Sequence, residues 1–124
     1  MLAIGSLPWC RIWRQNCGEI PVRDRSGKVI RVFHPGPPTG AADITGVVSP
    51  EGWRIEIEVK SATGKCSKEQ ENWRVNMAQL GAIYVLVQYD ETRSQEDNVM
   101  SALAAIERTV ETKRLFTRLA AESL

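Results

Sequence analysis

The sequence predicts an α/β fold in which a mixed β-sheet core is flanked by α-helices. Three patterns support this class. Residues 43–60 alternate apolar and polar side chains around a turn that contains Pro50 and Gly52, as in a β-hairpin. Residues 67–81 carry the start and stop signals of a helix, and residues 82–89 form a short apolar run typical of a buried strand.

Length and composition are those of a single domain spanning residues 1–124. The chain is 43% hydrophobic and 25% charged, which is ordinary for a soluble globular protein with one core. No apolar run approaches the ~20 residues of a membrane helix, and the first residues lack the charged-then-apolar order of a signal peptide. We therefore expect a cytoplasmic protein with no membrane partner.

Cysteine and histidine content argues against a zinc site. Cys10, Cys17 and Cys66 are widely spaced, no CxxC occurs, and His34 is the only histidine. We expect reduced, structural thiols and a structural or exposed histidine.

Charge is distributed unevenly along the chain, although the formal net charge is only +1. Residues 1–34 carry a net charge of +4 and residues 90–124 a net charge of −2. A basic N-terminal third could meet nucleic-acid phosphates, but such a run is more often a solvated face.

The patterns of the first 42 residues are less regular than those of the rest of the chain. Residues 1–18 lack a clear pattern, with a short helix or turn expected around 8–15. Residues 22–33 predict two strand pieces around Ser26 and Gly27. The three prolines and two glycines of residues 34–42 predict a loop.

Two helices are expected in the C-terminal half. Ser67 is placed to cap the first one, with Gln70 at the third position of a capping box and Gly81 as its end. The second begins near residues 94–97, and a last helical piece reaches towards Leu119. Its apolar stripe has spacings of four, three and four residues and consists of Val99, Leu103, Ile106 and Val110.

The turn at residues 49–52 predicts the register of the hairpin. Ser-Pro-Glu-Gly fits a type I turn, and closing the hairpin there pairs Gly46 with Ile55 and Asp43 with Glu58. One face of the hairpin is then entirely apolar or glycine, so a slip by one residue would turn apolar side chains towards solvent. A bulge at Gly46 would change this register.

In the expected register, Asp43 and Glu58 have Cβ atoms roughly 4.5–5.5 Å apart. Two carboxylates that close repel each other, and a Mg²⁺ or Mn²⁺ ion between them removes the repulsion. Lys60 points from the same face and could stabilise developing negative charge. The alternative is an ordinary solvated sheet face, which is how we interpret Glu56.

Asp43, followed after fourteen residues by Glu58-Val59-Lys60, resembles the D-(x)n-ExK signature of the PD-(D/E)XK nuclease superfamily. Three longer segments, PTGAADITGVV, GWRIEIEVKSATGKCSKEQENW and LGAIYVLV, look like the VRR-NUC family, particularly its small stand-alone viral members. IWRQNCG at 12–18 is similar to a segment of those proteins. The resemblance covers roughly residues 12–90.

This resemblance implies a restriction-endonuclease-like fold and a structure-specific DNA endonuclease that needs Mg²⁺ or Mn²⁺. It implies a homodimer acting on branched DNA such as Holliday junctions, in the host cytoplasm if the source is viral. Metal ligands would be Asp43, Glu58 and the backbone carbonyl of Val59, and Lys60 would be the catalytic lysine. Gln70 matches the family's motif glutamine.

Four residues are candidates for contact with the DNA backbone, namely Arg14, Asn16, Lys65 and Lys68; surface solubility is the alternative for each. The chain departs from the superfamily at one point, because many members bring a further acid from an N-terminal helix and only Glu19 precedes the loop here. Either this acid is absent or the protein begins upstream of Met1.

Two other functions stay open beside a junction-cutting nuclease. The first is a non-catalytic DNA-binding or regulatory module on the same fold, which the departure at the N-terminus motivates. The second is a nuclease that acts on flaps, nicked ends or linear duplex, since loops and dimer geometry select the DNA structure.

Overall fold

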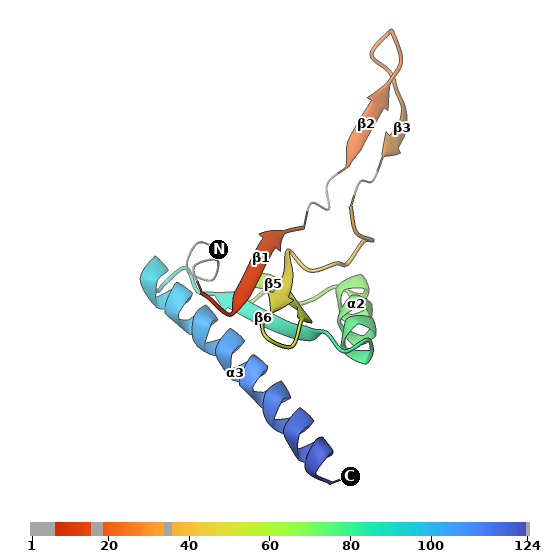
Figure 1. Ribbon diagram of the computed structural model, residues 1–124. Helices are drawn as coiled ribbons and strands as arrows, with labels where there is room; N and C mark the ends of the chain where they lie inside the picture. Colours follow the sequence, from red (N-terminus) through yellow and green to blue (C-terminus); the bar gives the residue numbers. More distant parts are fainter. Residues whose placement is uncertain (1–6, 16–18, 34–35, 124) are drawn as a thin grey trace.

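In the described residues, a four-stranded mixed sheet and two helices form the body of the protein, and a two-stranded hairpin projects from it (Figure 1). The structure is a computed structural model that describes residues 7–15, 19–33 and 36–123. The sheet has the order β1-β4-β5-β6 and consists of β1 (Cys10–Arg14), β4 (Ile44–Val48), β5 (Trp53–Ser61) and β6 (Ile83–Tyr89). The expectation of a mixed sheet flanked by helices is confirmed at this level.

Strand β1 replaces the short helix or turn that we expected around residues 8–15. It pairs antiparallel with β4, from Cys10 opposite Val48 to Arg14 opposite Ile44. Cys10 and Ile12 are buried while Arg11 is exposed, so the segment has the period-two pattern of a strand covered on one face. Pairing with β4 and burial of the apolar residues determine this conformation.

The β4–β5 hairpin has the predicted register. Gly46 lies opposite Ile55 and Ile44 opposite Ile57, with no bulge. The predicted type I turn is wrong, however. The Gly52 N–H donates to the Val48 carbonyl at 2.8 Å, and Gly52 has a φ of +75°. The loop therefore closes one residue earlier in the chain than a type I turn starting at Ser49 would, while the strand pairing is unchanged.

Helices α2 (Lys68–Gln79) and α3 (Gln95–Glu122) begin where they were predicted to begin, and α2 has its predicted cap. Ser67 and Gln70 form a reciprocal capping box at the start of α2, and Ser94 accepts from the Asp97 N–H at the start of α3. Gly81 has a φ of +94° just beyond α2, as expected for a glycine that ends a helix. No helix in the described ranges has the length and apolar character to cross a membrane.

The hydrophobic core lies between α3 and one face of the sheet. Ile106 and Val110 of α3 are fully buried against Ile55 and Ile57 of β5. Burying side chains of this size contributes about 1.5–3 kcal/mol each. Ile83 and Val85 of β6 are buried in this core, and the half-buried Val87 packs against it. The last two residues of β6 are exposed, so the expectation of a strand buried along residues 82–89 holds for its first part.

Two cysteines of the described chain are free thiols, as expected. Cys10 lies in the core, where burial raises its pKa, and Cys66 is half-buried. Cys17 and His34 lie outside the described residues.

The projecting hairpin is formed by β2 (Ile20–Arg23) and β3 (Val29–Phe33), at the position where two strand pieces were predicted. Together with the residues that adjoin them, residues 19–33 are called the arm below. Strands β2 and β3 pack on each other and contact no helix or strand of the body. The arm is therefore an extension of the chain between β1 and β4.

Candidate functional site

Asp43 and Glu58 meet at the end of the β4–β5 ladder, where β4 begins. The last pair of the ladder is Ile44 and Ile57, so Asp43 and Glu58 are the next residues outward on the opposite face. Asp43 Oδ2 accepts the Val59 N–H at 2.9 Å, and the Asp43 carbonyl accepts the Gln15 N–H at 2.9 Å. These bonds hold the exposed Asp43 carboxylate against β5, an inner strand of the sheet.

Glu58 is the buried carboxylate of this pair, with 1% of the residue exposed. Its Oε1 accepts from Gln70 Nε2 at 2.8 Å and lies 3.6 Å from the Lys60 Nζ. Its Oε2 is buried and has no hydrogen-bond partner within the described chain. Burial, and then the charge of Asp43, raise the pKa of Glu58, and Lys60 opposes this shift. One oxygen of the Glu58 carboxylate is thus left without a partner among the described residues, where a buried polar atom normally has one.

Lys60 and Val59 complete the β5 part of the site. The Lys60 side chain is 21% exposed, so its ammonium stands between Glu58 and solvent. Val59 donates its N–H towards β4, and the N–H and C=O of a strand residue point to the same side. The Val59 carbonyl therefore points to the side on which Asp43 lies. A backbone carbonyl that binds a metal together with the Asp43 carboxylate needs this orientation.

Gln70 performs two tasks at the first turn of α2. Its side-chain carbonyl accepts the Ser67 N–H at 2.9 Å, which completes the capping box. Its amide nitrogen donates to Glu58. The capping and site interpretations of this residue are therefore compatible, because each uses a different atom of the same amide.

Gly40 joins the loop before Asp43 to the start of α2. It has a φ of +93°, and a Cβ built on it would lie 2.4 Å from the Glu69 carbonyl oxygen. Ala41 and Ala42, between Gly40 and Asp43, are buried. The loop thus packs directly on the first helical turn and fixes Asp43 relative to Gln70.

Glu56 is buried, which corrects our interpretation of it as a solvated residue. It is 0% exposed, and its oxygens accept from Arg54 Nε and Gln15 Nε2, each at 2.9 Å. Burial raises the pKa of Glu56, and Arg54 opposes this shift. Both of its oxygens are hydrogen-bonded, so Glu56, unlike Glu58, has no unpartnered oxygen to offer a ligand.

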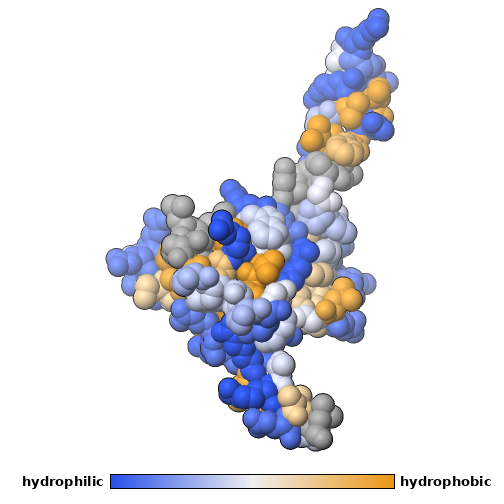
Figure 2. Space-filling model, viewed as in Figure 1, coloured by the Kyte–Doolittle hydropathy of each residue, from blue (hydrophilic) through white to orange (hydrophobic). Residues whose placement is uncertain are grey.

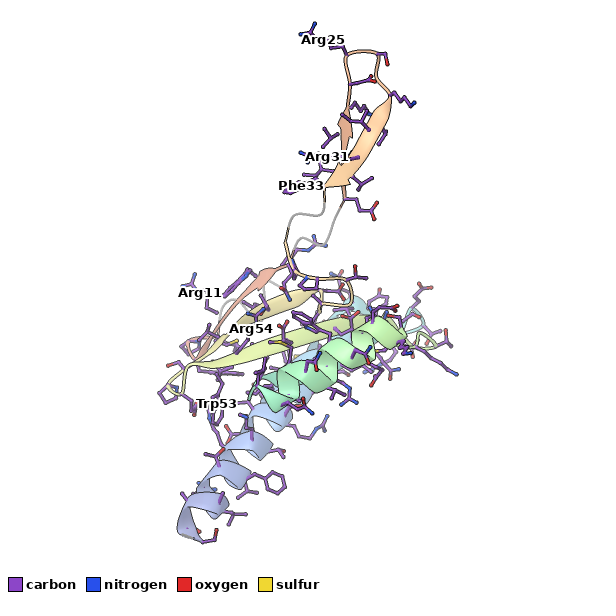
Figure 3. The ribbon with its side chains drawn as sticks, turned by 90° about the vertical axis from the view of Figure 1, so that its right-hand side faces the viewer. Arg11, Arg25, Arg31, Phe33, Trp53 and Arg54 are labelled. Carbon is purple, nitrogen blue, oxygen red and sulfur yellow. The ribbon has the colours of Figure 1, made fainter. Side chains whose placement is uncertain are left out.

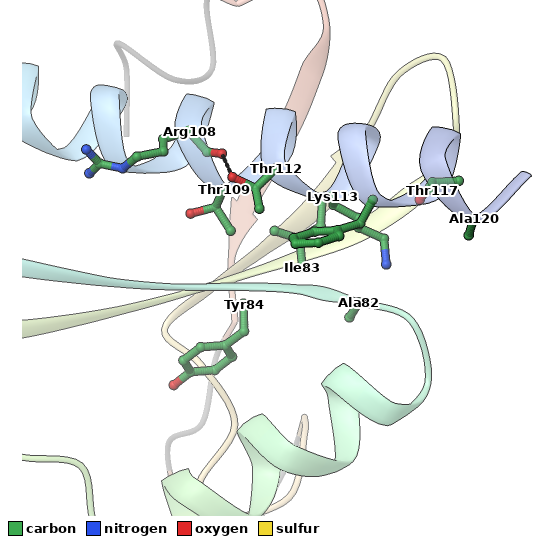
Figure 4. Close-up of a pocket in the computed structure, with 10 residues that line it drawn as sticks. Ala82, Ile83, Tyr84, Arg108, Thr109, Thr112, Lys113, Thr117 and Ala120 are labelled. Atoms are coloured by element: carbon green, nitrogen blue, oxygen red, sulfur yellow. Dashed lines mark hydrogen bonds between the residues drawn. The ribbon is translucent and has the colours of Figure 1, made fainter. Parts of the chain in front are cut away.

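Two further polar atoms lack partners in the layer between α2 and the sheet. The Tyr84 hydroxyl and Trp73 Nε1 are buried without a hydrogen bond inside the described ranges. Tyr84 lies across from Glu56 on β6 and points towards α2 (Figure 4). Burial, and then the charge of Glu58, raise the pKa of Tyr84. Sequence reasoning missed Tyr84, because its hydroxyl falls within a run of apolar residues.

The predicted DNA-contacting residues that the structure describes come from two places on the body. Arg14 is exposed at the end of β1, and Lys65 and Lys68 are exposed around the start of α2. Asn16 lies outside the described residues. Arg14 and the two lysines are accessible to a ligand, although none of them touches the carboxylates.

A cavity of about 610 Å³ lies elsewhere, between α3 and the start of β6 (Figure 4). Its lining contains Arg108, Lys113 and Phe116 but no acidic side chain. The chemistry of Asp43, Glu58 and Lys60 is therefore not located in this cavity.

The donor atoms at the site fit a hard divalent cation. No group of three or more His, Cys, Asp or Glu side chains gathers in the described ranges, so the site offers two carboxylates and a backbone carbonyl. Mg²⁺ commonly binds through one or two carboxylates and keeps several waters. The unpartnered Glu58 Oε2 supports such an assignment, since it is a ligand atom not engaged by the protein.

Because the ionised form of Glu58 is disfavoured by burial, Glu58→Gln should stabilise the metal-free protein. A carboxyl whose pKa is raised in the folded state binds its proton more tightly there than in the unfolded chain. The folded protein therefore loses stability as the pH rises above ~4.3, the ordinary pKa of a glutamate. We expect a gain of roughly 1 kcal/mol at pH 8, or ~3–5 °C in melting temperature, and almost none at pH 4. Thermal melts in EDTA measure this difference.

Glu107→Gln, which changes an exposed glutamate on α3, serves as the control and should leave the melting temperature within about 2 °C of wild type at both pH values. A Glu58→Gln protein that is less stable than wild type at pH 8 would contradict the prediction.

Comparison of the chain with protein-family models, with curated protein sequences and with solved structures gives no match.

Proposed function

We propose that this protein is a metal-dependent endonuclease that hydrolyses phosphodiester bonds in branched DNA such as four-way junctions. One observation carries the proposal: the buried, unpartnered Oε2 of Glu58 lies in a cluster with a second carboxylate, Asp43, and an ammonium, Lys60. Structural roles rarely leave a buried carboxylate oxygen without a partner. Metal-assisted phosphoryl transfer uses such an oxygen as a ligand.

Each residue has a distinct part in this proposal. Asp43, Glu58 and the Val59 carbonyl hold Mg²⁺ or Mn²⁺, which when bound lowers the pKa of a coordinated water and polarises the phosphate. Lys60 stabilises the charge that develops on the phosphoryl oxygens. Gln70 holds the Glu58 carboxylate in place through its 2.8 Å hydrogen bond.

A homodimer suits a four-way junction, because a two-fold axis would place two sites on symmetry-related strands. This part of the proposal depends on the resemblance to the VRR-NUC family.

A second candidate is a non-catalytic DNA-binding or regulatory module on the same fold. The observation in its favour is that the side-chain donors of the site amount to two carboxylates in the described part of the chain. Titration calorimetry separates the two functions: heat of Mn²⁺ binding that disappears in Asp43→Asn supports a metal site. Salt-sensitive DNA binding without any metal binding would favour the module.

The proposed activity is tested by comparing three labelled substrates of equal length: a four-way junction, a flap and a linear duplex. With Mg²⁺ or Mn²⁺, we expect cleavage of the junction at least ~10-fold faster than of the other two, and no cleavage in EDTA. Faster cleavage of the flap or duplex would replace the substrate class but keep the nuclease. No cleavage of any substrate with either metal would contradict the proposal.

A further inference from the structure

The strands of the arm, β2 and β3, are highly exposed and contact no other helix or strand of the described chain. All residues of β2 and β3 are exposed except Val22, which is half-buried. A two-stranded hairpin without other contacts is only marginally stable in water. An arm of this kind therefore suggests a ligand that it contacts when the protein works.

The turn at the end of the arm is tightly organised. Asp24 Oδ1 accepts from the Ser26 N–H at 2.8 Å, the Ser26 hydroxyl at 2.6 Å and the Lys28 N–H at 3.0 Å. The Arg23 guanidinium donates to the Gly27 carbonyl at 2.9 Å. These bonds use the one acidic side chain of the turn to hold the backbone in place, and they lower the pKa of Asp24.

None of the four cations of the arm has an ionic partner in the described ranges. Arg23 is used by its hydrogen bond to the Gly27 carbonyl, which leaves Arg25, Lys28 and Arg31. Arg25 lies at the tip, and Arg31 lies along the shaft (Figure 3). Figure 2 shows the tip as hydrophilic, with the hydrophobic residues gathered further down the arm. The end furthest from the body thus presents positive charge to solvent.

The arm is also connected in sequence to residues of the candidate site. It is inserted between Gln15 and Asp43, and the Gln15 N–H donates to the Asp43 carbonyl. The chain therefore leaves the sheet and returns to it beside the exposed carboxylate. A DNA strand bound at that carboxylate would continue past the base of the arm.

We propose that the arm binds the duplex that flanks the cleavage site, with Arg25, Lys28 and Arg31 against its phosphates; this inference rests on the proposed nuclease function. A two-stranded ribbon fits the major groove, which is about 12 Å wide. Unpaired cations on a ribbon match the negative charge of the groove walls.

The exposed apolar residues of the arm make a second copy of the chain the alternative occupant. They include Ile20, Ile30, Val32 and Phe33, each at least 43% exposed. Phe33 lies at the base of the arm, near the body, whereas Arg25 lies at its end (Figure 3). Unpaired positive charge at the tip favours DNA over a protein surface as the ligand that the tip meets.

The test compares two variants that each remove two positive charges, Arg25→Gln/Lys28→Gln on the arm and Arg108→Gln/Arg118→Gln on α3. Fluorescence anisotropy with a labelled four-way junction in EDTA gives the dissociation constant as a function of NaCl concentration. Each lost phosphate contact lowers the slope of log K against log[NaCl] by about 0.9. We expect the arm variant to lower the slope by about 2 and to weaken binding by up to ~50-fold at 0.1 M NaCl.

The α3 variant should keep the wild-type slope within about 0.5. An arm variant with the wild-type slope and affinity would overturn the inference. So would an arm variant whose only change, measured by sedimentation, is that it has become a monomer where the wild type is a dimer. If wild-type protein cleaves DNA while the arm variant binds normally, the arm proposal fails and the nuclease stands. If no substrate is cleaved but the arm variant loses its salt dependence, the nuclease fails and DNA binding by the arm stands.

Discussion

Replacing Lys60 with alanine should lower the rate of junction cleavage by about 100- to 1,000-fold and leave DNA affinity nearly unchanged. The Lys60 ammonium lies 3.6 Å from the Glu58 carboxylate, with its side chain 21% exposed. A cation in that position is shielded from water on one side, so it stabilises charge on a phosphate more strongly than a fully solvated lysine would. That charge is greatest in the transition state, which is why the rate changes and the affinity does not.

Single-turnover cleavage with saturating enzyme measures the rate, and anisotropy in EDTA measures the affinity. Lys68→Ala is the matched control, because Lys68 is an exposed lysine at the start of α2 that does not touch the carboxylates. It should lower the affinity a few-fold and leave the single-turnover rate within about 3-fold of wild type. Cleavage by Lys60→Ala at the wild-type rate would remove the lysine from the mechanism.

The part of the site that could be predicted from the sequence is the part determined by local rules. The side chains of a strand alternate with a period of two, so burying Ile55 and Ile57 on one face placed Glu58 on the other. Ser67 and Gln70 have the spacing of a capping box, and that box positions the amide that reaches Glu58. The turn type was predicted wrongly, but the predicted strand register is correct, because the apolar face alone was enough to determine it.

The burial of Glu56 could not be predicted, because one of its two hydrogen-bond partners, Gln15, comes from 41 residues away in the sequence. Gln15 reaches Glu56 only because β1 pairs with β4, and nothing in residues 8–15 marked that segment clearly as a strand. From the hairpin sequence alone, a glutamate opposite a threonine has the pattern of a solvated sheet face. The contact of Gly40 with α2 is non-local in the same way, since it joins a loop to a helix 29 residues later.

Gly40→Ala should destabilise the protein by about 2–4 kcal/mol and reduce cleavage at the same time. Two effects contribute to the loss of stability. An alanine at a φ of +93° costs about 1 kcal/mol. Its Cβ would also lie 2.4 Å from the Glu69 carbonyl oxygen and 3.0 Å from the Gln70 nitrogen. Because both are backbone atoms of the first turn of α2, the loop must move away from the helix, which separates Asp43 from Gln70.

Gly81→Ala is the control that separates the cost of a positive φ from the cost of the steric contact with α2. Gly81 has nearly the same φ, +94°, and a Cβ there would meet no atom within 4 Å. It should cost about 1 kcal/mol, or ~4 °C in melting temperature, against roughly 10 °C for Gly40→Ala. Cleavage measured well below both melting temperatures should be near wild type in Gly81→Ala and at least ~10-fold slower in Gly40→Ala. Equal melting temperatures for the two variants would show that the loop and α2 are not in contact, and normal cleavage by Gly40→Ala would show that the position of Asp43 does not depend on that contact.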